Sequence, residues 1–80
     1  REVNSGDPVS FYSTGGRIYC TNESGINISR VSVYSVTGSL LFSSGRISDL
    51  GNRQFRPGLY MVSVENEKER FTGKVLVADE

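Results

Sequence analysis

Turn-forming residues divide the chain into segments of about 7 to 13 residues, and this close spacing restricts the fold more than any other feature. Glycine, proline and asparagine each adopt backbone conformations that tight turns require. Turns are predicted at 15–16, 22–25, 37–38, 43–45, 51–52, 57–58 and 66. Short strands joined by turns at such intervals are typical of a β-sandwich or a β-barrel.

Between these turns, apolar residues alternate with polar ones at a period of two, which is the period of a strand and not of a helix. Nine valines and a single alanine also favour sheet over helix. We therefore expect an all-β fold with almost no helix. The alternating apolar sets are Val9 and Phe11, Ile18 and Cys20, Val31 and Val33, Leu40 and Phe42, Tyr60 with Val62 and Val64, and Phe71 with Val75 and Val77.

Two segments depart from simple alternation. Between residues 26 and 33 the apolar positions change from even to odd numbers near Ser29, which predicts either a bulge or a turn between two short strands. In 58–65 both faces are apolar, because Leu59 and Met61 occupy the second one. This pattern predicts a central strand, or a strand whose outer face packs on another surface.

The last part of the chain is predicted to form a hairpin. Its tip is the charged run 65–70, where Asn66 can adopt the left-handed conformation of a tight turn. In the strand that follows, Gly73 predicts a bulge or the close approach of another backbone, since glycine has no side chain to pack.

Length and charge exclude several classes of protein. Eighty residues form one domain, and so small a core leaves little room for an internal active-site cavity. Nine basic and nine acidic residues cancel, and the basic ones are scattered, so no surface for nucleic acid or an anionic membrane is predicted. Because the sequence begins at Arg1 rather than at methionine, we interpret residues 1–80 as a single domain excised from a larger protein.

The residue types that most catalytic and metal sites require are missing from the sequence. There is no histidine, which excludes Ser-His-Asp and Cys-His arrangements within the chain. One cysteine cannot build a zinc site of the Cys/His type, and Cys20 alternates with Ile18 as a small buried hydrophobe does. We therefore expect a non-enzymatic domain that has no cofactor, no metal and no small-molecule substrate.

Three stretches resemble a known pattern, and they occur in the order of that pattern. They are RVSVYSVTGSLLF at 30–42, FRPGLYMVSV at 55–64 and FTGKVLV at 71–77. Together they are similar to the C-terminal sorting domain of the type IX, or Por, secretion system of Bacteroidota. The resemblance covers roughly residues 16–77. The residues expected to form the recognition motif are Tyr34, Gly38, Pro57, Gly58, Tyr60, Val62, Val64, Lys74, Val75, Leu76 and Val77.

This resemblance implies an immunoglobulin-like antiparallel β-sandwich of about seven strands, attached to a cargo domain. It also implies export to the periplasm and then across the outer membrane to the cell surface or the extracellular medium. The implied partners are an outer-membrane secretion shuttle and a sortase-like protease. In the family the last two strands carry much of the sorting signal.

Two other functions fit the same sequence. The domain could be a structural module that packs on a neighbouring domain of a surface protein through Leu59 and Met61. It could instead be a carbohydrate-binding sandwich, because exposed tyrosines such as Tyr12, Tyr19 or Tyr34 can stack on sugars.

Overall fold

The computed structural model describes residues 9–22, 25 and 27–78, which form an all-β antiparallel sandwich, as the alternation predicted. The strands are β1 (Val9–Thr14), β2 (Arg17–Asn22), β3 (Arg30–Ser35), β4 (Leu40–Ser44), β5 (Gly58–Glu65) and β6 (Arg70–Val77). One short 3-10 helix, η1 (Ile47–Asn52), lies between β4 and β5 in the sequence. The described part of the chain thus contains six strands, where the resemblance implied about seven.

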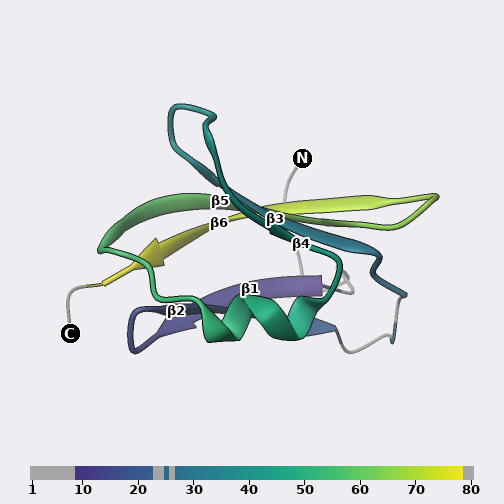
Figure 1. The fold of residues 1–80 in the computed structure, drawn as a ribbon, viewed down its shortest axis with the longest axis horizontal. Helices are drawn as coiled ribbons and strands as arrows, with labels where there is room; N and C mark the ends of the chain where they lie inside the picture. The colour runs from purple at the N-terminus through teal and green to yellow at the C-terminus, as the bar shows by residue number, and fades with distance from the viewer. Residues whose placement is uncertain (1–8, 23–24, 26, 79–80) are drawn as a thin grey trace.

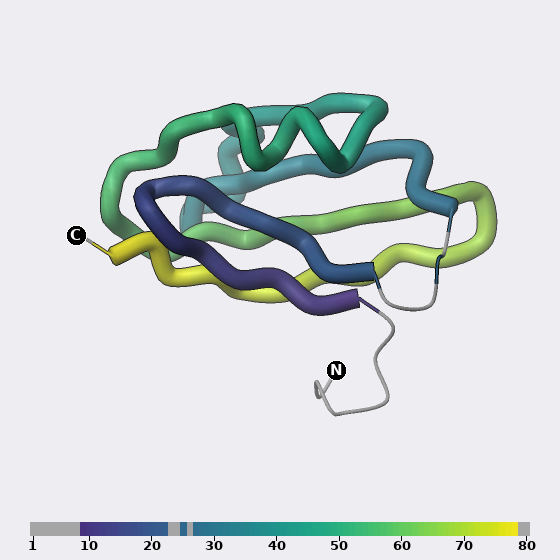
Figure 2. The backbone as a smooth tube through the Cα atoms, turned by 90° about the horizontal axis from the view of Figure 1, so that it is seen from below, coloured from purple at the N-terminus to yellow at the C-terminus, as the bar shows by residue number. Residues whose placement is uncertain are grey.

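Two antiparallel sheets form the two layers (Figure 1). One sheet has four strands in the order β4-β3-β5-β6, and the other is the β1-β2 hairpin. β1 lies against β6, and η1 lies beside β2, so that η1 completes the second layer (Figure 2). Because β5 lies between β3 and β6, the predicted central strand is confirmed.

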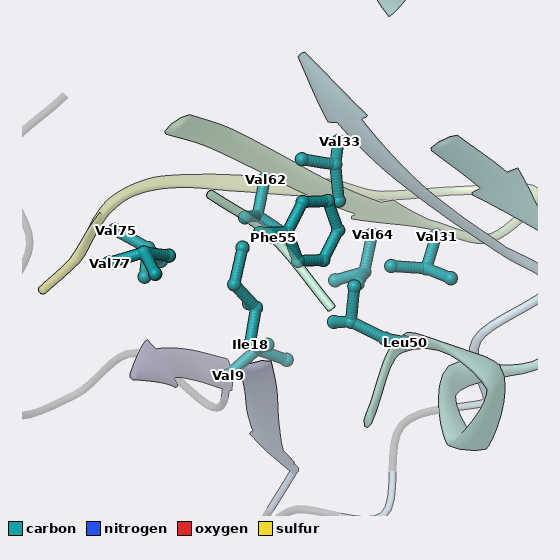
Figure 3. Packing of buried hydrophobic residues seen from close by; sticks show 10 residues of the cluster. All are labelled: Val9, Ile18, Val31, Val33, Leu50, Phe55, Val62, Val64, Val75 and Val77. Atoms are coloured by element: carbon teal, nitrogen blue, oxygen red, sulfur yellow. The ribbon is translucent and has the colours of Figure 1, made fainter. Parts of the chain in front are cut away.

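Ten buried apolar side chains of the described residues fill the space between the layers (Figure 3). The four-stranded sheet supplies the valines of the alternating sets, which project from one face as a period of two requires. The second layer contributes Val9, Ile18 and Leu50, and Phe55 lies just before β5. The core residues of the four-stranded sheet are Val31, Val33, Val62, Val64, Val75 and Val77.

The irregularity predicted near Ser29 is the start of a strand. β3 begins at Arg30, whereas residues 27–29 form no strand, and the backbone N–H of Ser29 donates to the carbonyl of Glu65 (2.9 Å). We expected two short strands separated by a bulge or a turn, but the described residues contain only one strand here, so this prediction is wrong for them; Ile26 lies outside them. A bulge is present in β4 instead, where Leu41 is the extra residue opposite Val33 and Tyr34 of β3.

This bulge places Leu40 on the outer face of the sheet. Val33 pairs with the inward-facing Phe42, but the next residue, Tyr34, pairs with Leu40. Residues paired across two strands lie on the same face, so Leu40 lies outward with Tyr34 and is 57% exposed. The prediction that Leu40 and Phe42 share a face is therefore wrong, because the extra residue, Leu41, reverses the alternation.

The hairpin tip predicted between β5 and β6 is confirmed, but its turn closes in a different way. Asn66 has no positive φ. Instead its side-chain Oδ1 accepts hydrogen bonds from the backbone N–H groups of Lys68 and Glu69, both at 2.8 Å. A side-chain acceptor therefore replaces the left-handed backbone that we expected.

Gly73 forms neither the bulge nor the close backbone contact that was predicted. It pairs in regular register with Val62. A Cβ atom at position 73 would lie 2.7 Å from Cδ2 of Phe11, so the glycine makes room for an aromatic ring from the other layer.

η1 was not predicted, and it carries one fully buried residue, Leu50. Its first turn has no side-chain cap, and the backbone N–H of Arg53 donates to the carbonyl of Leu50 (3.2 Å) at its end. No helix among the described residues has the length and the apolar character needed to cross a membrane.

Candidate functional site

The last two stretches of the family-like pattern form one antiparallel hairpin at an edge of the four-stranded sheet. β5 pairs with β6 along its whole length, which places Gly58 opposite Val77 and Met61 opposite Lys74. The first stretch forms β3 on the other side of β5, where Tyr34 pairs with Met61. The first stretch continues into the start of β4, so three stretches that are separate in the sequence lie together in one four-stranded sheet (Figure 1).

Four of the predicted recognition residues point into the core. Val62 and Val64 are fully buried, and Val75 and Val77 are nearly so. They face the second layer near Ile18 (Figure 3). Burying a valine side chain stabilises a fold by about 1.5 to 3 kcal/mol, so these residues contribute to folding. A partner cannot contact them while the domain is folded.

Four more of the predicted residues shape the backbone. Gly38 and Gly58 have positive φ angles of 94° and 152°, which side chains other than hydrogen rarely permit. Pro57 precedes Gly58 at the entry to β5. The hydroxyl of Tyr60 donates to the carbonyl of Arg56 (2.6 Å), while its ring packs against the core. These residues fix the β3–β4 turn and the start of β5.

The other three predicted residues, Tyr34, Lys74 and Leu76, lie on the outer face of the four-stranded sheet. One row across the strands consists of Leu40, Tyr34, Met61 and Lys74, and the adjacent row pairs Leu59 with Leu76. Leu59 is 43% exposed and Leu76 is 67% exposed. We define the outer apolar surface as Tyr34, Leu40, Leu59, Met61 and Leu76. Lys74 borders this surface.

Toward the β5–β6 hairpin tip the same face becomes polar. Ser32 of β3 pairs with Ser63 of β5 on this face, and both serines are buried. The Oγ of Ser63 makes no hydrogen bond with any described residue. Farther along, Arg70 forms an ion pair with Glu65 (3.0 Å), which is accessible to solvent and contributes little to stability. The face thus changes from apolar near Leu76 to charged at the tip.

Sequence patterns missed one residue of the outer apolar surface, Leu40. A signal is present, because the Leu40–Leu41 doublet breaks the alternation as a bulge does. Which leucine lies opposite Tyr34 depends on the pairing of β3 with β4, and alternation within one strand does not contain that information.

The last strand lies at the edge of its sheet, where β1 of the other layer contacts it. The hydroxyl of Ser13 in β1 donates to the backbone carbonyl of Leu76 (2.7 Å). This hydrogen bond joins the two layers at the backbone of Leu76, whose side chain is exposed on the outer face of the sheet.

Cys20 is the single thiol of the sequence, and burial raises its pKa to about 11. It is half-buried, and its Sγ donates a weak hydrogen bond to the carbonyl of Thr21 (3.7 Å). A thiol with so high a pKa stays protonated near neutral pH and is a poor nucleophile. Its surroundings are those of a small apolar side chain.

Comparison of the chain with protein-family models, with curated proteins and with solved structures found no match. The features of the structure that bear on function are the outer apolar surface, Lys74 at the border of that surface, and the edge strand β6.

Proposed function

We propose that this chain is a C-terminal sorting domain that directs an attached cargo protein across the outer membrane by the type IX secretion system. One observation supports the proposal above all others. The three stretches that resemble the family pattern form β3 with the start of β4, β5 and β6, which belong to one sheet, and their outward residues share one face. A receptor can contact such a face without unfolding the domain.

In this proposal the inward residues of the pattern fold the domain, and the outward residues bind the secretion shuttle and the sortase-like protease. Leu76 is the most exposed apolar residue of the outer apolar surface. Lys74 places a charge on an edge strand, which opposes unspecific pairing with other strands. A few such residues can carry most of the binding energy of an interface.

Deleting residues 74–80 is an ambiguous test of this proposal. The deletion removes Val75 and Val77 from the core as well as Lys74 and Leu76 from the surface. Arrest of the cargo could then follow from unfolding alone. Substitutions of outward residues separate recognition from folding.

The sharper test replaces Lys74 and Leu76 together, as Lys74→Glu with Leu76→Ser. The chain is fused behind a reporter with a signal for the periplasm and expressed in a bacterium that has a type IX system. We expect the amount of reporter on the cell surface to fall by about tenfold or more, because a few anchor residues carry most of the binding energy of an interface. The folded reporter should then accumulate in the periplasm. Protease accessibility on whole cells measures the surface fraction.

Leu41→Ser is the matched control for this experiment. Leu41 is an apolar residue at the β4 bulge, 40% exposed and outside the outer apolar surface. Its replacement should leave the surface fraction unchanged. Full surface display of the Lys74→Glu, Leu76→Ser variant, with its fold intact by circular dichroism, would refute the proposal.

The outer apolar surface also favours a second candidate, a structural module that packs on a neighbouring domain of a surface protein. Leu59 is an exposed apolar residue at a position where polar residues are the rule for a solvated sheet face. In this case Leu59→Ser lowers the free energy of unfolding of the full-length protein but changes that of the isolated chain little. Reporter export would be unaffected by the same substitution, which distinguishes the two candidates.

A further inference from the structure

The β1–β2 hairpin presents a second outward face, on the layer opposite the outer apolar surface. Figure 2 views the molecule from this side, and no described element covers the hairpin. Three cross-strand pairs form this face. They are Ser10 with Thr21, Tyr12 with Tyr19, and Thr14 with Arg17.

Two stacked tyrosine rings lie at the centre of this face. The ring centroids of Tyr12 and Tyr19 are 5.4 Å apart, and the ring planes differ by 25°. On its other side Tyr19 packs against η1, where a Cβ atom added to Gly51 would lie 3.0 Å from the ring. Tyr19 is therefore fixed between the η1 backbone and Tyr12. Tyr12 is 49% exposed, so its aromatic surface is available to a ligand.

The side chains around the two rings are hydrophilic. Ser10 and Thr21 hydrogen-bond to each other through their hydroxyls on one side of the rings. On the other side, Thr14 and the exposed Arg17 form the next pair. Arg17 has no ion-pair partner among the described residues, and neither strand contains an acidic residue. The face is thus aromatic at its centre, hydroxylic at its flanks and positively charged at one end.

These properties together match an acidic sugar chain. A pyranose ring presents a face of C–H groups that stacks on the electron-rich face of an aromatic ring. Its hydroxyl groups exchange hydrogen bonds with serine and threonine hydroxyls. A uronic acid adds a carboxylate, which a guanidinium binds through two parallel hydrogen bonds.

Other ligand classes fit this face less well. Nucleic acid requires several cationic contacts to phosphates, whereas Arg17 is the single charged residue of the two strands. A hydrophobic protein partner requires aliphatic surface, and the six outward side chains include no aliphatic one.

We propose that the outward face of the β1–β2 hairpin binds polysaccharides that contain uronic acids. Tyr12 stacks on a sugar ring, Tyr19 holds the Tyr12 ring in place, and Arg17 binds the carboxylate of a neighbouring sugar. This binding is independent of the proposed sorting function, because it uses the other layer of the sandwich.

Nuclear magnetic resonance titration of the ¹⁵N-labelled 80-residue chain tests the proposal. The probe is trigalacturonate, and the corresponding neutral galactose trisaccharide is its control. We expect trigalacturonate to shift amide resonances of residues 10–21 and of Gly51, with weaker binding of the neutral sugar. Tyr12→Ala should weaken trigalacturonate binding at least tenfold. Arg17→Gln should reduce it to the level of the neutral sugar.

Tyr34→Ala is the matched control, because Tyr34 lies on the outer face of the other sheet. It should leave binding unchanged, and the dispersion of the amide resonances verifies that each variant is folded. The absence of shifts in the hairpin, shifts confined to another face, or equal weakening by Tyr34→Ala would overturn the proposal. Equal binding of the two trisaccharides would overturn its preference for acidic sugars.

Discussion

At position 73 the four-stranded sheet has no side chain, and the ring of Phe11 occupies the space above it. A Cβ atom there would lie 2.7 Å from Cδ2 of Phe11, closer than non-bonded carbons approach. The ring is attached close to the backbone and cannot move away without shifting β1. We predict that Gly73→Ala lowers the free energy of unfolding by about 1 to 3 kcal/mol, the usual cost of overpacking. Urea denaturation of the purified chain measures this change.

Gly45→Ala is the control for this substitution. Neither Gly45 nor Gly73 has a positive φ, but a Cβ atom at Gly45 would lie 3.7 Å from the carbonyl of Ser29, an ordinary contact. The Gly45→Ala variant should be as stable as the unsubstituted chain or slightly more stable, because alanine restricts the backbone of the unfolded chain. Adding Phe11→Leu to Gly73→Ala should recover part of the loss. If Gly73→Ala and Gly45→Ala unfolded at the same urea concentration, packing by Phe11 would not explain the glycine.

The buried thiol of Cys20 makes stability depend on alkaline pH. Its pKa is raised from 9.0 to about 11 because burial disfavours the thiolate. The unfolded chain therefore loses this proton at lower pH than the folded chain. The resulting stabilisation is complete below pH 9 and is lost as the pH rises through about 11. In Cys20→Ala we predict a smaller decrease in the free energy of unfolding between these pH values.

The comparison of slopes isolates Cys20 from the other groups of the chain, because both proteins retain those groups. Urea denaturation at a series of pH values gives the free energy of unfolding of each protein as a function of pH. If this free energy fell equally with pH in the wild-type chain and in Cys20→Ala, the assignment of the raised pKa to burial of this thiol would be contradicted.

The β5–β6 hairpin depends on the side chain of Asn66 in its turn. Oδ1 accepts two backbone hydrogen bonds, and the backbone N–H of Asn66 donates to the carbonyl of Glu69 (2.9 Å). Asn66→Ala removes the acceptor and should cost about 1 kcal/mol in stability, the usual net value of such hydrogen bonds. Asn66→Asp keeps the acceptor and should be nearly neutral. Urea denaturation of the variants measures both effects.

Asn66→Gly distinguishes the side-chain acceptor from a left-handed backbone. If a positive φ were needed at position 66, glycine would preserve or increase stability. Since Asn66 has no positive φ, we expect glycine to destabilise the chain at least as much as alanine. A stabilised Asn66→Gly variant would show that the turn closes through its backbone conformation.

At the level of strands, the sequence predicted what depends on neighbours in the chain and missed what depends on pairing between strands. Alternation placed Val62 and Val64 on one face, and the apolar second face of β5 indicated its central position. The outward position of Leu40 follows from a bulge, which exists only relative to the partner strand. η1 has no period to detect in six residues, and only the surrounding layers explain why Leu50 is buried.

The candidate recognition residues were predictable to a similar degree. The resemblance grouped eleven of them in three stretches without regard to which side of a strand they occupy. Alternation along β6 already separates Val75 and Val77 from Lys74 and Leu76, and the structure shows that the two valines are the buried pair. The stacking of Tyr12 on Tyr19 needed the register of the β1–β2 hairpin, which the structure supplied.

As a whole, the molecule has unequal layers, because a four-stranded sheet faces a two-stranded hairpin. η1 lies beside β2 and contacts β3 and β4, so it covers the part of the larger sheet that the hairpin leaves open (Figure 2). Its one buried side chain, Leu50, is 1% exposed and belongs to the same core cluster as Val31 and Val64 (Figure 3). The integrity of both layers should therefore depend on this leucine.

We predict that Leu50→Ala abolishes cooperative unfolding at 37 °C. Removing a buried leucine costs about 2 to 5 kcal/mol, and a scaffold of this size has only about 3 to 5 kcal/mol in total. Amide dispersion in nuclear magnetic resonance spectra should collapse in β5 and β6 as well as in the β1–β2 hairpin, because the two layers share one core. Leu41→Ala removes the same atoms from an exposed position and should retain a native spectrum. A Leu50→Ala chain that kept native dispersion in the four-stranded sheet, while the hairpin lost it, would mean that the layers fold independently.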